Sequence, residues 1–135
     1  MILEIDMAGD IPIYQQIRNQ IVFGTATGRL KVGEPLPTVR QLASDIGVNP
    51  MTVNKAYGLL KDEGVIVIDR RHGAKINELP SADDGFINDN LTAEFEQRAA
   101  LLISEARMKG VSQENLRVHL NILVDNIYNQ KGEIL

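Results

Sequence analysis

The sequence predicts a mainly α-helical protein with a small β-hairpin: an N-terminal winged helix-turn-helix followed by a C-terminal two-helix tail. Two short helical patterns lie on either side of Gly47, and a β-branched run and a short return strand flank a charged turn at residues 70–73. A polar stretch then precedes a second helical region. We therefore expect a winged helix-turn-helix domain over residues 1–78, a linker over 79–90 and a helical dimerisation region over 91–135.

The first helix is expected to begin near residue 12 and to end at about Thr27. Asp10 is suited to cap it, Pro12 suits its first turn because a missing N–H does no harm there, and Gly28 suits its end. Its apolar residues recur at four-residue spacing and are Ile13, Ile17 and Ile21. The glycine and prolines in residues 29–37 predict a connector.

The next two helices are expected to form the helix-turn-helix. One runs from Thr38 to about Ile46 and ends at Gly47, and its inward residues are Val39, Leu42, Ala43 and Ile46. The other is capped by Asn49, has Pro50 in its first turn, and ends near Glu63 and Gly64. Its buried stripe is formed by Val53, either Ala56 or Tyr57, and Leu60.

The β-branched run at residues 65–69, the turn at 70–73 and the return at 74–77 predict the hairpin, or wing. Beyond the linker, one helix is expected to end near Gly110, and Ser112 is expected to cap a second. Two helices of this size bury too little surface to form a core alone, so we expect a second copy to cover them. The residues expected at that dimer contact are Phe95, Leu102, Ile103, Leu116, Leu120, Leu123 and Ile127.

Composition excludes several classes of protein. Cysteine is absent, which excludes disulfides and thiolate chemistry and favours the cytoplasm. No apolar run is long enough for a membrane span, and the first ten residues do not resemble a signal peptide. The net charge is −4, but residues 29–75 contain 8 Lys and Arg against 5 Asp and Glu. A locally positive surface on an acidic chain is compatible with phosphate binding.

Residues 36–76 carry a series of short motifs. They are Leu36-Pro37-Thr38-Val39-Arg40-Gln41-Leu42-Ala43, Gly47-Val48-Asn49-Pro50-Met51-Thr52-Val53, Ala56-Tyr57-Gly58-Leu59-Leu60, Glu63-Gly64 and Arg70-Arg71-His72-Gly73. Together they resemble the GntR family of bacterial transcription regulators, and Asn49-Pro50-x-Thr52-Val53-x-Lys55-Ala56-Tyr57 resembles its YtrA branch. The resemblance implies a DNA-binding winged helix with a short two-helix tail. It also implies control of transport, because regulators of this branch are often encoded beside ABC-type transporters.

The third helix is the expected reader of the DNA major groove, where asparagine can pair with adenine and lysine can neutralise phosphate. Its outward residues are Met51, Thr52, Asn54, Lys55 and Gly58. The alternatives are that Asn49 and Thr52 only cap the helix, that Asn54 is solvated, and that Met51 fills space beside the turn. Pro50 and Asn54 stand where other branches of the family often have arginine, so the base preference of those branches does not transfer.

Two further sets of residues are expected at DNA. The resemblance implies a phosphate-contacting arginine at Arg40, beside Thr38 at the start of the same helix; the alternative is an ion pair between Arg40 and Asp45 or Glu34. At the wing tip, Arg70, Arg71, His72 and Gly73 suit insertion into a narrow minor groove, although a solvated hairpin turn has a similar composition.

The sequence thus predicts a homodimeric transcription regulator, a repressor, that binds double-stranded DNA at an inverted repeat. The alternative is a winged-helix module that binds proteins. No catalytic cluster is evident, and His72 and His119 each lack a second metal ligand, so we expect no enzyme activity, metal or cofactor. An unidentified small-molecule effector would fit only at the dimer seam or at the junction of the tail with the DNA-binding domain.

Overall fold

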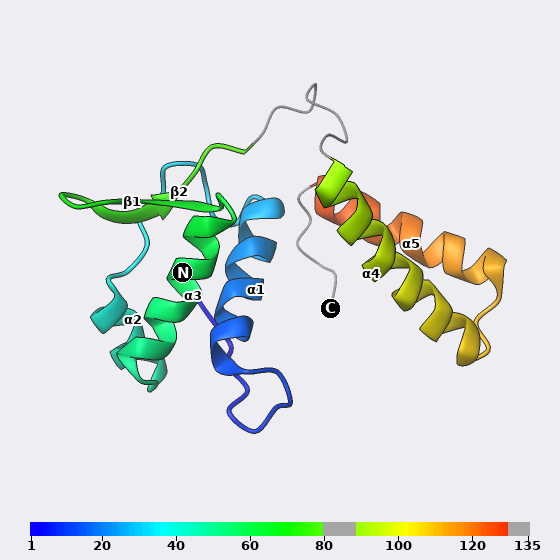
Figure 1. Cartoon of the computed structure of the whole chain (residues 1–135), viewed down its shortest axis with the longest axis horizontal. Helices are drawn as coiled ribbons and strands as arrows, with labels where there is room; N and C mark the ends of the chain where they lie inside the picture. Colours follow the sequence, from blue (N-terminus) through cyan, green and yellow to red (C-terminus); the bar gives the residue numbers. More distant parts are fainter. Residues whose placement is uncertain (80–88, 130–135) are drawn as a thin grey trace.

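The computed structural model describes residues 1–79 and 89–129. Its elements in chain order are α1 (Ile13–Ala26), α2 (Val39–Ile46), α3 (Pro50–Asp62), β1 (Ile66–Asp69), β2 (Gly73–Ile76), α4 (Asp89–Met108) and α5 (Gln113–Tyr128) (Figure 1). The predicted fold class, mainly α-helical with one β-hairpin, is confirmed. Within the described ranges, no helix combines the length and the apolar character that crossing a membrane requires.

α3 lies between α2 and α1 in the N-terminal part, below the hairpin, and contacts α1, α2 and β1 (Figure 1). Its expected inward stripe is buried, and both Ala56 and Tyr57 belong to it together with Val53 and Leu60. The remaining buried apolar residues are Ile17, Ile21, Leu30, Leu36, Leu42, Ala43, Ile66, Ala74 and Ile76. The removal of these side chains from water holds α3 in place and leaves its opposite side free to face outward.

Short-range signals set the ends of the two central helices. The stop at Gly47 and the cap at Asn49 are as the sequence predicts, whereas Thr38 was expected as the first residue of its helix and caps it instead. The Thr38 Oγ1 atom accepts a hydrogen bond from the Gln41 N–H at 3.1 Å, and Gly47 ends α2 with a left-handed φ of 71°. The Asn49 Oδ1 atom accepts a hydrogen bond from the Met51 N–H at 2.8 Å and so caps α3. Each cap satisfies a backbone group that the helix itself leaves unpaired.

The start of α1 differs from the prediction, because Pro12 and not Asp10 occupies the cap position, and no side chain caps the helix. Pro12 directly precedes the first helical residue, Ile13, so Asp10 lies two residues before the cap position. The first turn is held instead by the Pro12 carbonyl, which accepts hydrogen bonds from the N–H groups of Gln15 and Gln16 at 3.0 Å each. The expectation that Asp10 caps this helix was wrong.

The first residues form an arm along α1 that the sequence did not reveal. The Gln20 side chain donates to the Glu4 carbonyl at 2.6 Å and accepts from the Glu4 N–H at 2.9 Å. The Gln16 side chain bonds to the backbone of residue 6 in the same way. These amide pairs bring Leu3 and Ile5 against the apolar core.

The hairpin is antiparallel, and residues 66–69 pair with residues 73–76. Ile66, Ala74 and Ile76 are buried against the helices. Gly73 was expected in the turn but opens β2, opposite Asp69, with a φ of 73°. Glycine adopts this left-handed conformation without strain. Because Gly73 is paired in β2, the turn consists of residues 70–72 alone.

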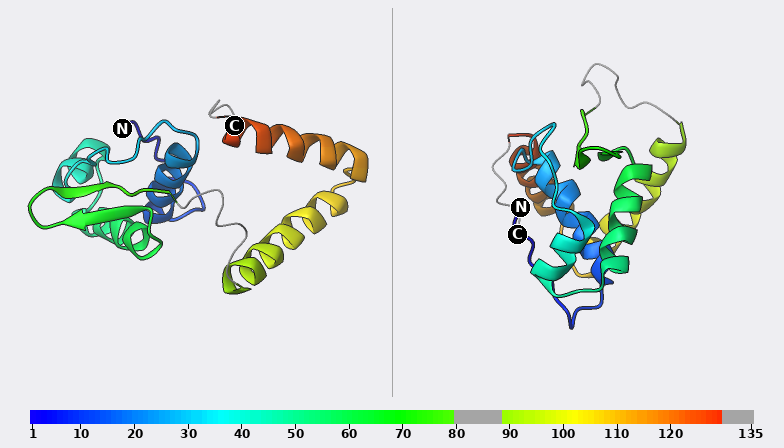
Figure 2. Two further views of the ribbon diagram at one scale, coloured as in Figure 1. Left: turned by 90° about the horizontal axis from the view of Figure 1, so that it is seen from above. Right: turned by 90° about the vertical axis from the view of Figure 1, so that its left-hand side faces the viewer.

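The tail consists of α4 and α5, and Ser112 caps α5 as expected, accepting a hydrogen bond from the Asn115 N–H at 3.1 Å. α5 has no buried residue. Figure 2 shows that the two helices diverge from the turn that joins them. Most of the expected linker (79–90) lies outside the described residues, and α4 begins at Asp89, before the expected start of the tail at residue 91.

Candidate nucleic-acid interface

The outward side of α3 presents a compact set of polar and flexible side chains. Asn54 and Lys55 are exposed, Thr52 is half-buried, and Met51 is 78% exposed. The exposure of Met51 shows that it does not fill space beside the turn. The first two turns of α3 therefore offer side chains of the types that read base edges in the major groove.

α2, which packs against α3, carries a single cation. Arg40 is exposed, and it forms no ion pair with Asp45, Glu34 or any other residue in the part of the chain that the structure describes. The alternative role that we considered for Arg40 is therefore absent. Thr38 is exposed too, but its hydroxyl accepts the Gln41 N–H and serves as a cap. Arg40 remains available for an external anion.

Lys55 has an intramolecular partner that the sequence did not reveal. Its Nζ atom lies 4.0 Å from the centre of the Tyr14 ring, which belongs to α1. A cation over an aromatic face is attracted to the ring's electrons, which restricts a side chain that would otherwise be mobile. The contact thus holds the Lys55 charge at the side of α3 that faces α1.

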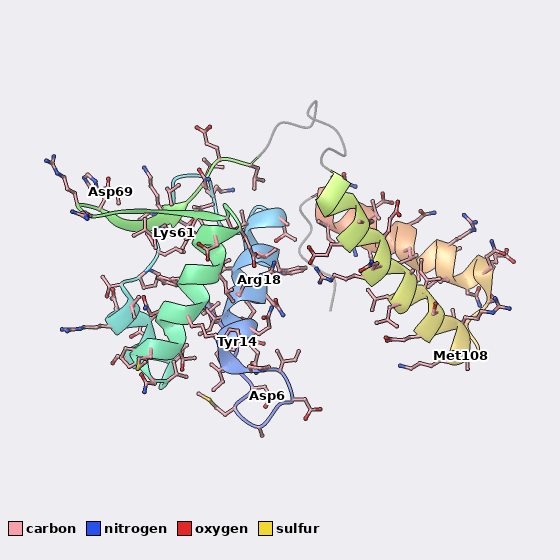
Figure 3. The ribbon with its side chains drawn as sticks, viewed as in Figure 1. Asp6, Tyr14, Arg18, Lys61, Asp69 and Met108 are labelled. Atoms are coloured by element: carbon pink, nitrogen blue, oxygen red, sulfur yellow. The ribbon has the colours of Figure 1, made fainter. Side chains whose placement is uncertain are left out.

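The turn of the wing is organised by one carboxylate. The Asp69 Oδ1 atom accepts a hydrogen bond from the Arg71 N–H at 2.8 Å, and its Oδ2 atom lies 3.0 Å from the His72 Nδ1 atom. These contacts, the backbone one first, hold the pKa of Asp69 below its usual value. Arg70 and Arg71 are exposed. In Figure 3, Asp69 marks the end of the hairpin that points away from α4 and α5.

A hydrogen bond ties α3 to the segment that precedes α2. The Tyr57 hydroxyl donates to the Pro37 carbonyl at 2.8 Å. Tyr57 is only 3% exposed, and burial raises the pKa of its phenol to about 12. Because Pro37 directly precedes the cap of α2, this bond fixes the position of α2, and of Arg40 upon it, relative to α3.

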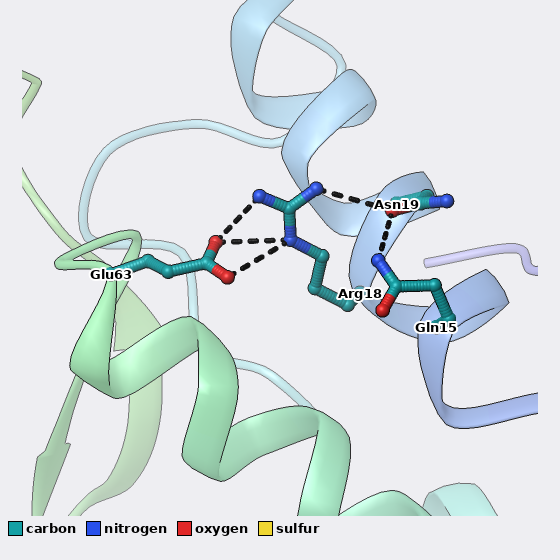
Figure 4. A network of polar contacts seen from close by, with 4 residues as sticks. All are labelled: Gln15, Arg18, Asn19 and Glu63. Carbon is teal, nitrogen blue, oxygen red and sulfur yellow. Dashed lines mark hydrogen bonds and ion pairs between the residues drawn. The ribbon is translucent and has the colours of Figure 1, made fainter. Parts of the chain in front are cut away.

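An ion pair between Arg18 of α1 and Glu63, the residue after α3, ties the C-terminal end of α3 to α1 (Figure 4). The Arg18 Nη2 and Nε atoms lie 2.7 and 2.9 Å from the Glu63 Oε2 atom. The Arg18 Nη1 atom also donates to the Asn19 Oδ1 atom at 3.1 Å, and Gln15 donates to the same oxygen at 2.9 Å. The two charged side chains are 23% and 36% exposed, so the pair is partly shielded from water. No pattern in the sequence indicates this contact, which joins residues 45 positions apart.

The apolar residues expected at a dimer contact lie open on the tail. Phe95, Leu102, Ile103 and Leu120 are 54%, 66%, 46% and 38% exposed. Leu116, Leu123 and Ile127 are half-buried. Phe95 and Leu102 also line a cleft that α4 shares with α1 and the end of α3.

The two histidines lie apart from any cluster of metal ligands. His72 contacts Asp69, and His119 is exposed on α5. Within the described ranges, no three His, Asp or Glu residues gather in a group that could hold a metal ion.

Comparisons with known proteins agree on one family. The family model of the bacterial regulatory proteins of the gntR family matches residues 12–76, from the start of α1 to the end of the wing. The HTH-type transcriptional repressor YtrA of Bacillus subtilis (strain 168) is 39% identical over 114 residues, which cover 84% of this chain and 85% of that protein.

Two solved structures extend the likeness to the tail. A transcriptional antiterminator from Listeria monocytogenes EGD-e superposes with a TM-score of 0.82 at 29% identity, covering 95% of this chain and 93% of its own. The GntR-family transcription factor YtrA from Sulfolobus acidocaldarius superposes with a TM-score of 0.59 at 39% identity, covering 75% of this chain and 99% of its own.

Proposed function

Because the chain belongs to the GntR family of bacterial regulatory proteins, in its YtrA branch, we propose that it is a cytoplasmic repressor that binds an inverted-repeat operator as a homodimer. Transcription regulators of this family bind DNA and generally act as dimers. The observation that supports the proposal most is the exposed start of α3, together with exposed Arg40 on the adjacent α2, which has no ion pair among the described residues, and two exposed arginines at the wing. In this proposal residues 1–78 bind DNA and residues 91–135 pair the protomers.

α3 enters the major groove, and each contact has its own role. Asn54 reads a base edge, while Thr52 and Met51 contact neighbouring groups in the groove. Arg40 and Lys55 neutralise phosphates. Thr38 and Asn49 cap α2 and α3, and the starts of these two helices face the DNA backbone.

The wing contacts the flanking minor groove, where Arg70 and Arg71 meet a concentrated negative potential. The bond between His72 and Asp69 holds the turn in shape, and Gly73 allows close approach of the backbone. The α3 helices of the two protomers then occupy major grooves about 34 Å apart.

Arg40→Ala tests the phosphate contact. Removing one phosphate-neutralising charge lowers the slope of log K against log salt by about 0.9, so the slope of a dimer should fall by about 1.8. Binding to operator and non-operator DNA should weaken alike, because phosphates are the same in both. Arg107→Ala, on the last turn of α4, removes the same charge far from the site and is the matched control. An unchanged salt slope for Arg40→Ala refutes the phosphate role.

Asn54→Ala tests base reading. Removal of a bidentate contact should weaken operator binding by about 1–3 kcal/mol and leave non-operator binding unchanged. The measurement is a fluorescence titration with labelled duplexes, using the operator and a scrambled sequence. A decrease that is equal for both duplexes would place Asn54 outside the specific contact. Absence of saturable binding by the parent chain at low salt would favour a winged-helix module for protein partners.

Leu120→Glu tests the dimer. Since α5 has no buried residue, this substitution disturbs little within a protomer. We expect sedimentation to show single protomers and operator affinity to fall, because two linked half-sites bind more tightly than one. Asn121→Glu adds the same charge at the next residue and should leave the dimer intact. Single protomers in the parent protein would remove the basis of the proposed assembly.

The operon under control is proposed to encode a transporter, as the likeness to the YtrA branch implies. In a strain that lacks the gene, transcripts of that operon should rise if the protein represses. A fall would identify an activator, and unchanged transporter transcripts would refute this target. A small molecule that acts as effector must change operator affinity, since a ligand shifts an equilibrium only through its differential affinity.

A further inference from the structure

One wall of the cleft between the tail and the winged helix belongs to a rigid surface. The cleft measures about 650 Å³, and this wall is formed by Arg18, Val22, Glu63 and Val65. Arg18 and Glu63 form the ion pair of Figure 4, and Glu63 directly follows the last residue of α3. Val22 and Val65 pack partly against the core beside it. Whatever binds this surface is therefore fixed relative to α3.

The other wall is one continuous face of α4, formed by Glu94, Phe95, Arg98, Ala99 and Leu102. Spacings of three and four residues place these side chains on the same side of a helix. Phe95 and Leu102 are more than half exposed. Glu94 and Arg98 form no ion pair in the part of the chain that the structure describes.

The two walls match in chemistry. Each has apolar side chains together with one arginine and one glutamate. Opposite charges around apolar centres are the arrangement that favours a specific contact, since the charges align the surfaces and the apolar groups leave water. The walls already lie on either side of one cleft, so a small movement of α4 would bring them together.

We propose that α4 docks through its Glu94–Leu102 face onto the surface formed by Arg18, Val22, Glu63 and Val65 of its own protomer. The docked tail sets the direction of α3 relative to α5. Phe95 and Leu102 then serve this contact, and the contact between protomers is left to Ile103 and the apolar residues of α5. In the proposed dimer, this docking also fixes the spacing of the two α3 helices. That consequence rests on the proposed function, whereas the docking itself does not.

The absence of cysteine in the chain permits a direct test. In the full-length protein, Val65→Cys with Ala99→Cys places one thiol on each wall. Val65→Cys with Ala100→Cys is the matched control, because Ala100 neighbours Ala99 but does not line the cleft. With a glutathione redox buffer and no DNA, the first pair should form an intramolecular disulfide about tenfold faster than the control, since docking raises the effective concentration of one thiol at the other.

Arg98→Glu in the Val65→Cys, Ala99→Cys protein tests the charge matching. It should lower the rate of disulfide formation toward that of the Val65→Cys, Ala100→Cys control. Arg107→Glu, which lies beyond the cleft, should leave this rate unchanged. Equal rates for the two cysteine pairs, disulfide-linked dimers as the main product, or an unchanged rate in Arg98→Glu would each overturn the proposal. Circular dichroism of each variant confirms that it is folded. Because no DNA is present, a negative result in this assay leaves the DNA-binding proposal standing, and the reverse also holds.

Discussion

Tyr57→Phe should weaken the fold at neutral pH and lose that disadvantage at high pH. The substitution removes the hydroxyl that donates to the Pro37 carbonyl at 2.8 Å and keeps the buried ring. An intramolecular hydrogen bond of this kind contributes about 1 kcal/mol net to the free energy of unfolding. We therefore expect Tyr57→Phe to be less stable than the parent protein by about that amount at neutral pH.

The pH dependence follows from the buried phenol. Burial raises the pKa of Tyr57 from 10.0 to about 12, so the folded state favours the neutral form. Its contribution to stability is complete below pH 10 and is lost as the pH rises through 12. A rise of two units corresponds to at most about 2.7 kcal/mol. The stability advantage of the parent over the variant should therefore shrink as the pH rises, pass through zero and reverse by up to about 1.7 kcal/mol.

Urea unfolding followed by circular dichroism, in parallel for the two proteins at a series of pH values, measures this difference. Effects of all other titrating groups cancel between them. Tyr128→Phe removes a hydroxyl from an 82% exposed residue of the tail and serves as the control. A difference between parent and Tyr57→Phe that stays constant through the alkaline range, or the same pH trend in Tyr128→Phe, would refute the reasoning.

Two further outcomes follow from local geometry. A methyl group added at Gly58 of α3 meets no atom within 4 Å, whereas one added at Gly24 of α1 lies 3.1 Å from the Leu30 Cδ1 atom. Gly58→Ala should therefore raise the urea midpoint, by up to about 1 kcal/mol in stability, and Gly24→Ala should raise it less; a larger gain at Gly24 would contradict this. At the wing, the depressed pKa of Asp69 means that its bond to the Arg71 N–H persists above the usual aspartate value and is lost as the pH falls through its lower folded value. Carbon NMR of the carboxyl should give a midpoint below 3.8, and a midpoint at or above it would contradict the assignment.

The predictions from sequence succeeded where the signal is local. The end of α2 at Gly47 and the cap of α3 at Asn49 depend on a residue and its neighbours within one turn, and both are confirmed. The buried stripe of α3 was predicted for a similar reason, because helical periodicity alone decides which residues share a face. The error at Asp10 has a local cause too: Pro12, expected inside the first turn, takes the cap position itself, and its carbonyl accepts the backbone bonds of that turn.

The contacts that position the candidate interface were not predictable in this way. The bond from Tyr57 to Pro37 and the pair of Arg18 with Glu63 join residues 20 and 45 positions apart. Nothing in the spacing of such residues distinguishes partners from solvated side chains, since the contact exists only after the helices have packed. The resemblance to a family supplied the expected DNA-contacting residues, and their roles remain predictions.

The arm along α1 changes where the folded unit begins. The family model starts at residue 12, yet Leu3 and Ile5 seal one side of the core, and the amides of Gln16 and Gln20 are bonded to the backbone ahead of that point. A fragment trimmed to the family boundary would open apolar surface to water and leave two glutamines without their partners. Dissection of this regulator should therefore keep the first eleven residues, and any purification tag is better placed at the other terminus.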